Sequence, residues 1–154
     1  MKAVIQRVSS ANVSVDGKTI GECGKGFLIL LGVAEGDTEK DIELLARKTA
    51  NLRIFCDSED KMNLSVLDIG GEILCISQFT LCADVKKGNR PSFINAMEPE
   101  KASLYYDKFC DELLKLGVKR VEKGIFGADM KVSLVNDGPV TILYDTEIWN
   151  KNGN

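Results

Sequence analysis

Two short segments carry side chains that could do chemistry. In the first, Ser77-Gln78-Phe79-Thr80, hydroxyl and amide groups follow directly on the apolar run at residues 73–76. Strand ends that open into loops are where rigid scaffolds often present functional groups. Hydroxyl groups at such a place can also merely satisfy the backbone at a strand terminus. Both interpretations of Ser77 and Thr80 stay open on these residues alone.

The second segment, residues 136–141, reads Asn-Asp-Gly-Pro-Val-Thr and is predicted to be a turn between two strands. Asp-Gly is typical of an ordinary hairpin, with Pro139 starting the next strand. The other possibility is a cis peptide bond between Gly138 and Pro139, which X-Pro bonds reach at a cost of about 0.5 to 1 kcal/mol. Because Gly138 has no Cβ, such a turn can press bare carbonyl groups against a ligand.

The chain contains no histidine, which excludes Ser-His and Cys-His catalytic pairs and histidine metal sites. Its five cysteines are an odd number and share no C-x-x-C spacing, so we expect reduced thiols. We therefore expect no metal and no cofactor. If the protein is an enzyme, its proton transfers come from other groups.

The composition limits which binding partners and which cellular compartment we expect for this protein. The net charge of −3 argues against a long nucleic-acid interface, because such affinity comes from neutralising phosphates, so any RNA contact should be local. No apolar run approaches the roughly 20 residues of a membrane span, and residues 1–10 lack the apolar block of a secretion signal. We expect a cytoplasmic protein that does not bind membranes or DNA.

The elements that must position these segments follow from periodicity and turn residues. A helix is expected at residues 39–51, where Thr38 and Asp41 resemble a capping box, and a second begins at Pro99 and ends before Gly117. Asp16-Gly17 predicts a hairpin turn. Residues 78–97 are expected to be irregular. Strands are expected at 3–8, 12–15, 18–23, 27–32, 52–56, 72–77, 118–123, 130–135 and 140–144.

This order predicts a single α/β domain of 154 residues in which mixed, mostly antiparallel β-sheets are flanked by two α-helices. No linker, repeat or low-complexity stretch divides the chain.

The two chemical segments, taken with four others, resemble the D-aminoacyl-tRNA deacylase family. The resemblance covers residues 1–145 in one order and spacing, and the tail at 146–154 lies outside it with no assigned role. The matching stretches are MKAVIQRV at 1–8, RIF at 53–55, KMNLSV at 61–66, SQFTL at 77–81, RPSF at 90–93 and SLVNDGPVT at 133–141.

The resemblance implies a barrel-like fold and a homodimeric enzyme that hydrolyses the ester bond of D-aminoacyl-tRNA, a chiral proofreading step in translation, with glycyl-tRNA as a further expected substrate. The end of the SQFTL strand of one subunit would face Gly138-Pro139 of the other. The carbonyls of that cis pair, acting in trans, would occupy the space that an L side chain needs. Chirality is then tested by steric exclusion, which suits an enzyme that accepts many D-amino acids.

For the chemistry, the backbone N–H groups near Phe79 and Thr80, assisted by Ser77 or Gln78, are candidates to stabilise the developing oxyanion. Thr80 as a covalent nucleophile is an alternative, although no histidine exists to activate it. We favour assistance by the substrate, in which the 2′-hydroxyl of the terminal adenosine orients or activates water.

Several further residues have an expected role in the site, and each also has a purely structural alternative. Arg7 is expected to hold the Gly138-Pro139 turn, or else to form an exposed salt bridge. Candidates for an adenosine pocket, or for the core, are Phe126, Ala128 and Met130. Candidates to contact tRNA phosphates, or to form a solvated loop, are Lys86, Lys87 and Arg90.

Two other functions remain open on the sequence. A non-catalytic dimeric module could bind an amino acid or a nucleotide in the same groove. A general esterase or peptidase is disfavoured by the missing histidine.

Overall fold

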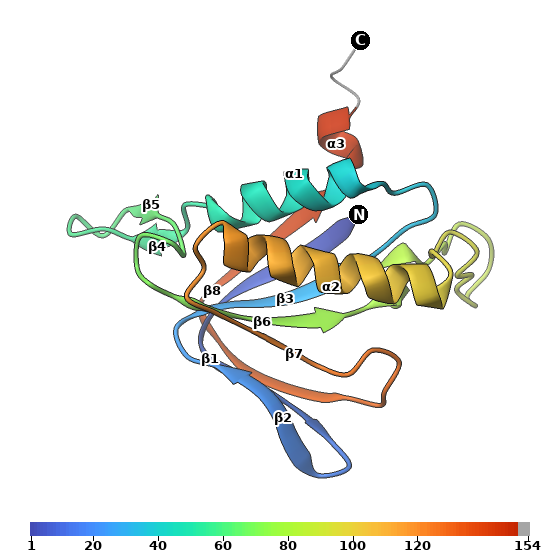
Figure 1. Cartoon of the computed structure of the whole chain (residues 1–154), viewed down its shortest axis with the longest axis horizontal. Helices are drawn as coiled ribbons and strands as arrows, with labels where there is room; N and C mark the ends of the chain where they lie inside the picture. Colours follow the sequence, from blue (N-terminus) through green and yellow to red (C-terminus); the bar gives the residue numbers. More distant parts are fainter. Residues whose placement is uncertain (151–154) are drawn as a thin grey trace.

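The computed structural model describes residues 1–150, which form a six-stranded mixed sheet with helices on one face and a separate two-stranded sheet (Figure 1). The elements are β1 (Lys2–Val15), β2 (Lys18–Cys23), β3 (Gly26–Gly32), α1 (Glu39–Ala50), β4 (Phe55–Cys56), β5 (Met62–Leu64), β6 (Glu72–Ser77), the 3-10 helix η1 (Phe79–Cys82), α2 (Pro99–Lys115), β7 (Arg120–Lys123), β8 (Lys131–Asp145) and α3 (Glu147–Asn150). The sheet runs in the order β2-β1-β3-β6-β7, and β8 also pairs with β1. Pairs β3–β6 and β6–β7 are parallel, whereas β1 is antiparallel to β2, β3 and β8. A single α/β domain with a mixed sheet was expected and is confirmed.

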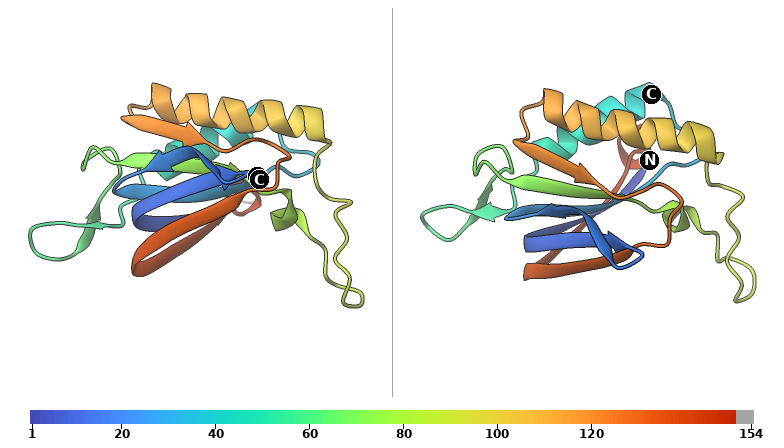
Figure 2. Two further views of the ribbon diagram at one scale, coloured as in Figure 1. Left: turned by 90° about the horizontal axis from the view of Figure 1, so that it is seen from below. Right: turned by 60° about the horizontal axis from the view of Figure 1, so that its bottom comes forward.

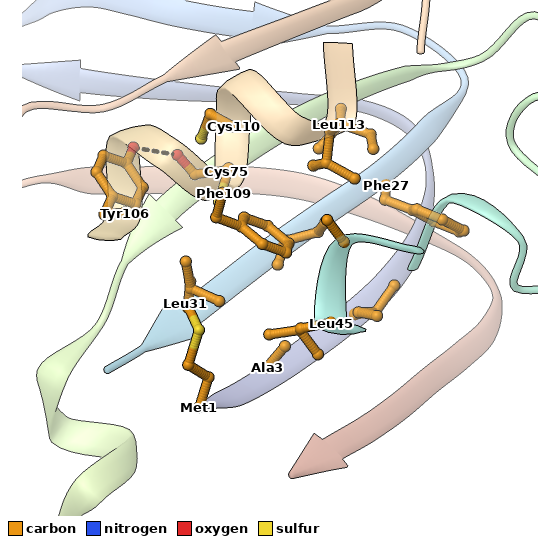
Figure 3. Close-up of a cluster of buried hydrophobic side chains, with 14 of the residues drawn as sticks. Met1, Ala3, Phe27, Leu31, Leu45, Cys75, Tyr106, Phe109, Cys110 and Leu113 are labelled. Carbon is orange, nitrogen blue, oxygen red and sulfur yellow. Dashed lines mark hydrogen bonds between the residues drawn. The ribbon is translucent and has the colours of Figure 1, made fainter. Parts of the chain in front are cut away.

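The central strand β3 and the interior of β6, residues 73–76, are apolar because both of their faces are covered. Helices α1 and α2 lie side by side over one face (Figure 1), where Phe27, Ile29 and Phe109 belong to the larger core. Figure 3 shows part of this core, with Phe109 among its neighbours from the strands. Leu28 and Leu74 point to the opposite, concave face and belong to a second, smaller core. Alternate side chains along these strands therefore point into the two cores.

The sheet curls until its edge strands meet, as expected for a barrel-like fold (Figure 2). Gly21 of β2 lies against the backbone of β7, and a Cβ on it would come within 2.6 Å of the Lys123 carbonyl oxygen. Only glycine allows the two edges to approach this closely.

Both long helices begin and end as their sequences predict. The Thr38 amide and hydroxyl donate to the Asp41 carboxylate, at 2.8 and 3.1 Å, at the start of α1. Pro99 is the first residue of α2, and Glu98 caps that helix by accepting from the Lys101 amide at 2.6 Å. Gly117 follows the last turn with φ +107°.

Two pairs of expected strands are each one long strand. Residues 3–8 and 12–15 both belong to β1, and residues 130–135 and 140–144 fall almost entirely within β8. The prediction of a turn at 136–141 was therefore wrong. Gln6 pairs with Thr141 and Val8 pairs with Asn136, so residues 137–140 lie opposite a single residue of β1 and form a bulge within the strand.

Smaller differences concern short elements. The strand expected at 52–56 is reduced to Phe55–Cys56, and its partner β5 was not predicted. One helical turn, η1, lies within the segment expected to be irregular, and the short helix α3 was also unforeseen.

The first residues of the tail at 146–154 pack on the domain. The Thr146 hydroxyl accepts from the Met1 ammonium at 2.6 Å, and Asn150 donates to the Asp41 carboxylate at 2.9 Å. Trp149 packs edge-on against Tyr144, with ring centroids 5.0 Å apart. Residues 151–154 lie outside the described residues. Among residues 1–150, no helix combines the length and apolar character that a transmembrane segment needs.

Candidate active site

A pocket of about 600 Å³ opens at the end of the sheet where β6 and β7 finish. Because these strands are parallel, the segments that follow them, 78–82 and 124–130, leave the sheet at the same edge. The start of α2 and the loop before it line the remaining side. Apolar side chains dominate the lining, as is usual for ligand pockets. Among the expected site residues, Ser77, Gln78, Phe79, Phe126, Ala128 and Met130 line this pocket.

Two backbone amides have no acceptor among residues 1–150 where β6 turns into η1. The Gln78 amide donates to the Leu31 carbonyl at 2.7 Å, which continues the parallel ladder one residue beyond Ser77. The next two amides, of Phe79 and Thr80, begin the 3-10 helix and so lack a preceding carbonyl partner. Within residues 1–150 neither amide donates a hydrogen bond. Two free donors therefore stand at the strand end, as an oxyanion hole requires.

The Thr80 hydroxyl is engaged by its neighbour. Gln78 Nε2 lies 2.5 Å from Thr80 Oγ1. Neither the nitrogen nor the oxygen of a carboxamide takes up a proton near neutral pH. The neighbour of Thr80 is thus no general base, and the Thr80 side chain is exposed and outside the pocket lining. The arrangement does not favour Thr80 as a nucleophile.

Tyr106 of α2 forms part of the pocket wall and fixes β6. Its hydroxyl donates to the Cys75 carbonyl at 2.6 Å, two residues before Ser77 (Figure 3). Burial raises the pKa of this phenol, so it stays protonated and remains a donor. Its ring packs against Phe126 at 6.3 Å between centroids.

The segment between β7 and β8 supplies the opposite wall. Gly124 lies against Met130, since a Cβ on it would fall 2.5 Å from the thioether sulfur. Phe126, Ala128 and Met130 are all half-buried and turn toward the pocket. Their assignment to the core was the alternative interpretation, and the structure places them at the boundary between core and pocket.

Phe79 and Phe93 mark the mouth of the pocket. They pack edge to face at 5.0 Å, and their exposed fractions are 54% and 37%. These exposed rings offer a stacking surface beside the free amides. Phe93 belongs to the RPSF stretch, but no role was predicted for it.

The Gly138-Pro139 segment is a second exposed feature, separate from the pocket. Its peptide bond is cis, and neither residue is among those that line the pocket of the same chain. Asn136 braces the bulge, because its side-chain oxygen accepts from the Val140 amide at 2.8 Å and its nitrogen donates to the Thr141 hydroxyl at 3.1 Å. Asp137, Gly138 and Pro139 are exposed.

Arg7 holds this bulge from the neighbouring strand, as expected. Its Nε donates to the Asp137 carbonyl at 2.8 Å, and its Nη1 donates to the Ile54 carbonyl at 2.6 Å. Within residues 1–150 it forms no ion pair, so the alternative of a surface salt bridge does not apply. A Cβ on Gly138 would lie 2.8 Å from Arg7 Nη2, and the φ of +138° at this position favours glycine.

The basic cluster lies apart from the pocket lining. Lys86, Lys87 and Arg90 are exposed on a loop whose neck is closed by two hydrogen bonds between Asp84 and Ser92, at 2.7 and 2.9 Å. Figure 2 shows the segment between η1 and α2 reaching away from the sheet.

Several lining residues were not predicted as site residues. Tyr106 and Pro99 were assigned only to a helix and its start, because nothing in the local sequence separates a pocket wall from a core face, and Glu98 had no assignment. Polar residues that follow strands are the signal that located Ser77 and Gln78. No comparable signal marks a wall residue contributed by a helix. In the part of the chain that the structure describes, no group of three acidic, cysteine or histidine side chains is arranged to hold a metal ion.

Known proteins share both the sequence and the fold of this chain. The family model described as D-Tyr-tRNA(Tyr) deacylase matches residues 4–145. A D-aminoacyl-tRNA deacylase of Roseiflexus castenholzii is 59% identical over 149 residues, which cover 97% of this chain and 94% of the relative. A D-aminoacyl-tRNA deacylase of Clostridium botulinum is 57% identical over 146 residues, covering 95% of this chain and 97% of the relative.

Two solved structures have the same architecture. A protein described as c-Myc DNA Unwinding Element Binding Protein superposes with a TM-score of 0.89 at 46% identity, covering 94% of this chain and 98% of its own. A probable eukaryotic D-amino acid tRNA deacylase superposes with a TM-score of 0.79 at 18% identity over the same shares, which supports the fold alone.

Proposed function

Because this chain belongs to the D-Tyr-tRNA(Tyr) deacylase family, we propose that it hydrolyses the ester bond of D-aminoacyl-tRNA, releasing free tRNA and the D-amino acid. It is thus an enzyme, a carboxylic ester hydrolase, and not the non-catalytic binding module that the sequence left open. The observation that carries the mechanism is the pair of free amides at Phe79 and Thr80 beside an apolar pocket.

In this proposal the terminal adenosine of tRNA enters the pocket. Phe126 and Met130 offer an aromatic ring and a thioether to the base, and both suit a flat π-system. The scissile carbonyl then lies near the end of β6. Lys86, Lys87 and Arg90 contact phosphates of the acceptor end from their exposed loop.

Water attacks the ester carbonyl, and the negative charge that develops on its oxygen is stabilised by the amides of Phe79 and Thr80. Each preorganised donor of this kind lowers a barrier by about 3 to 4 kcal/mol. The C–O bond to the ribose then breaks, the ribose oxygen takes a proton, and the carboxylate leaves. The 2′-hydroxyl next to the ester orients or activates the water.

A substrate with a 2′-deoxy terminal adenosine tests this step. We expect almost no turnover of D-tyrosyl-tRNA that lacks this hydroxyl, whereas Thr80→Ala should retain most activity on the ordinary substrate. The opposite pair of results would establish Thr80 as the nucleophile.

We further propose that the enzyme works as a homodimer in the cytoplasm, with Gly138 and Pro139 of one subunit facing the pocket of the other. Their exposed carbonyls then fill the space of an L side chain, and glycine, which has none, is accepted as a substrate along with D-amino acids. Support comes from the exposure of the segment and its fastening by Arg7 and Asn136. Its position outside the pocket of its own chain calls for action in trans.

Gly138→Ala tests the chirality filter. The added Cβ would meet Arg7 Nη2 and Val140 Cγ2, each at 2.8 Å, on a backbone with φ +138°. We expect the segment to shift and the preference for D-tyrosyl-tRNA over L-tyrosyl-tRNA to fall. Gly17→Ala is the matched control, because φ is +78° there and nothing lies within 4 Å of the added atom. Unchanged discrimination in Gly138→Ala would refute the filter.

A DNA-binding function is the second candidate, because one similar structure carries that description. The net charge of −3 makes DNA binding weak in this chain. A filter-binding titration with duplex DNA at physiological salt should show no specific complex.

A further inference from the structure

Arg7 joins two parts of the chain that the sheet does not connect. One is the bulge at Asp137, and the other is the carbonyl of Ile54, which precedes β4. With no carboxylate in ion-pair range among residues 1–150, the guanidinium is held by these main-chain oxygens. The position of Ile54 therefore sets the direction in which Arg7 reaches the bulge.

The β4–β5 hairpin, which follows Ile54 directly, has few backbone hydrogen bonds between its strands, although the Asp57 amide donates to the Lys61 carbonyl at 2.8 Å in its turn. Its strands pair through only two residue pairs, Phe55 with Leu64 and Cys56 with Met62, with a register shift between them. Phe55 anchors the root of the hairpin by stacking on Phe27, with ring centroids 5.2 Å apart. A two-stranded hairpin of this size needs other contacts to keep one conformation.

A set of side-chain bonds supplies those contacts. Arg53 donates from Nε to the Asn63 carbonyl at 2.9 Å and from Nη2 to the Asn63 side-chain oxygen. Asn63 Nδ2 in turn donates to the Asp57 carboxylate at 3.2 Å. Asp57 also accepts from the amides of Glu59 and Lys61, at 2.9 and 3.1 Å, which fixes the turn. These residues belong to the RIF and KMNLSV stretches and to the turn between them.

We propose that Arg53 and Asn63 are positioning residues for the Gly138-Pro139 segment. By closing the hairpin they hold the Ile54 carbonyl where Arg7 can span from it to Asp137. A hairpin that contributes no residue to the pocket then determines discrimination between D and L substrates. This inference rests on the proposed role of Gly138-Pro139 as the chirality filter.

The test compares Arg53→Ala and Asn63→Ala in the full-length protein, with kcat/KM measured on D- and L-tyrosyl-tRNA. We expect the ratio of D to L to fall about tenfold in each variant, since a lost charge-assisted hydrogen bond corresponds to at least that factor. Arg53→Lys should restore part of the ratio, because lysine can make one of the two bonds but not both. Arg120→Ala is the matched control, since it removes an exposed arginine that pairs with Glu72 and Glu122 on another part of the sheet.

A double variant separates positioning from a general loss of stability. If Arg53 acts through Arg7, adding Arg53→Ala to Arg7→Ala should lower the ratio no further. Additive losses in the double variant, or an unchanged ratio in both hairpin variants, would overturn the inference. Gly138→Ala, measured in the same assays, distinguishes a failure of this inference from a failure of the proposed chirality filter. Its ratio of D to L kcat/KM falls if the filter is right, even where the hairpin has no influence.

Discussion

Replacing Tyr106 with phenylalanine removes one oxygen atom from the wall of the pocket and leaves the ring in place. That oxygen donates to the Cys75 carbonyl at 2.6 Å in a buried setting. Tyr106 is 3% exposed, and Cys75 is fully buried. The carbonyl therefore loses a buried donor in the substitution.

The expected loss follows from this burial. A hydrogen bond whose partner is left buried and unsatisfied costs about 1 to 3 kcal/mol of the free energy of unfolding. In a domain of this size each kcal/mol lowers Tm by roughly 2 to 4 °C, so Tm should fall by several degrees. Because Cys75 lies two residues before Ser77, kcat/KM on D-tyrosyl-tRNA should also fall, at temperatures where the variant is fully folded.

Thermal unfolding of Tyr106→Phe and of Tyr105→Phe provides the measurement. Tyr105 is the neighbouring residue of α2 and is similarly buried, but its hydroxyl makes no hydrogen bond within residues 1–150. Its variant should unfold within a degree or so of the parent protein. Equal Tm values for the two variants would refute the reasoning that the Tyr106 hydroxyl fixes β6.

Three other expectations concern the substrate and pH. Phe126→Ala should raise KM for D-tyrosyl-tRNA while kcat changes little, since base stacking is worth about 1 to 3 kcal/mol, and an unchanged KM would place the adenosine elsewhere. Replacing Lys86 and Lys87 together by alanine should weaken binding of D- and L-substrates alike and reduce the slope of log affinity against log salt by about 0.7 for each phosphate that is no longer neutralised. The amide of Gly24 lowers the pKa of Glu72 below its ordinary 4.5. The Glu72 carboxylate therefore stabilises the fold above pH 4.5, and this stabilisation is lost as the pH falls through the lower folded-state pKa. Glu72→Gln should make the free energy of unfolding less dependent on pH across this range, which denaturant unfolding at several pH values measures.

Local sequence predicted those parts of the fold that depend on local chemistry. Asp16-Gly17 forms the expected turn, with φ of +50° and +78° and with Val15 paired to Lys18 across it. The helix starts at Thr38 and Pro99 were likewise readable, because capping needs only neighbouring residues.

Asp137-Gly138 is also an Asp-Gly pair, but it lies in a bulge within β8 and does not form a hairpin turn. The partner strand decides it, because β1 runs for 14 residues and pairs with β8 on both sides of the bulge. Both halves of β8 must therefore continue in one direction, and the extra residues bulge out. No window around Asp137 contains that information, which lies more than a hundred residues away in β1.

The candidate site also has some features that the local sequence predicts and others that depend on distant parts of the chain. Ser77 and Gln78 were found because polar groups follow an apolar strand, whereas their meeting with Phe126 depends on the parallel pairing of β6 with β7. Tyr106 reaches the same pocket from a helix face whose pattern is that of an ordinary core. The resemblance to a family indicated that segments distant in the sequence act together, which hydrophobic periodicity could not indicate.

The two free amides at the start of η1 have a consequence for mutagenesis. A scan that truncates one side chain at a time would pass over them, because every residue type except proline keeps the same main-chain N–H. Phe79→Pro is the change that deletes a donor. Proline is well tolerated at the first position of a helix, and Gln78 before it lies outside the helical region that a following proline disfavours, with φ −145° and ψ 80°. Compared with Phe79→Ala, which lacks the same ring but keeps the N–H, this variant would then offer one donor fewer to the reacting oxygen.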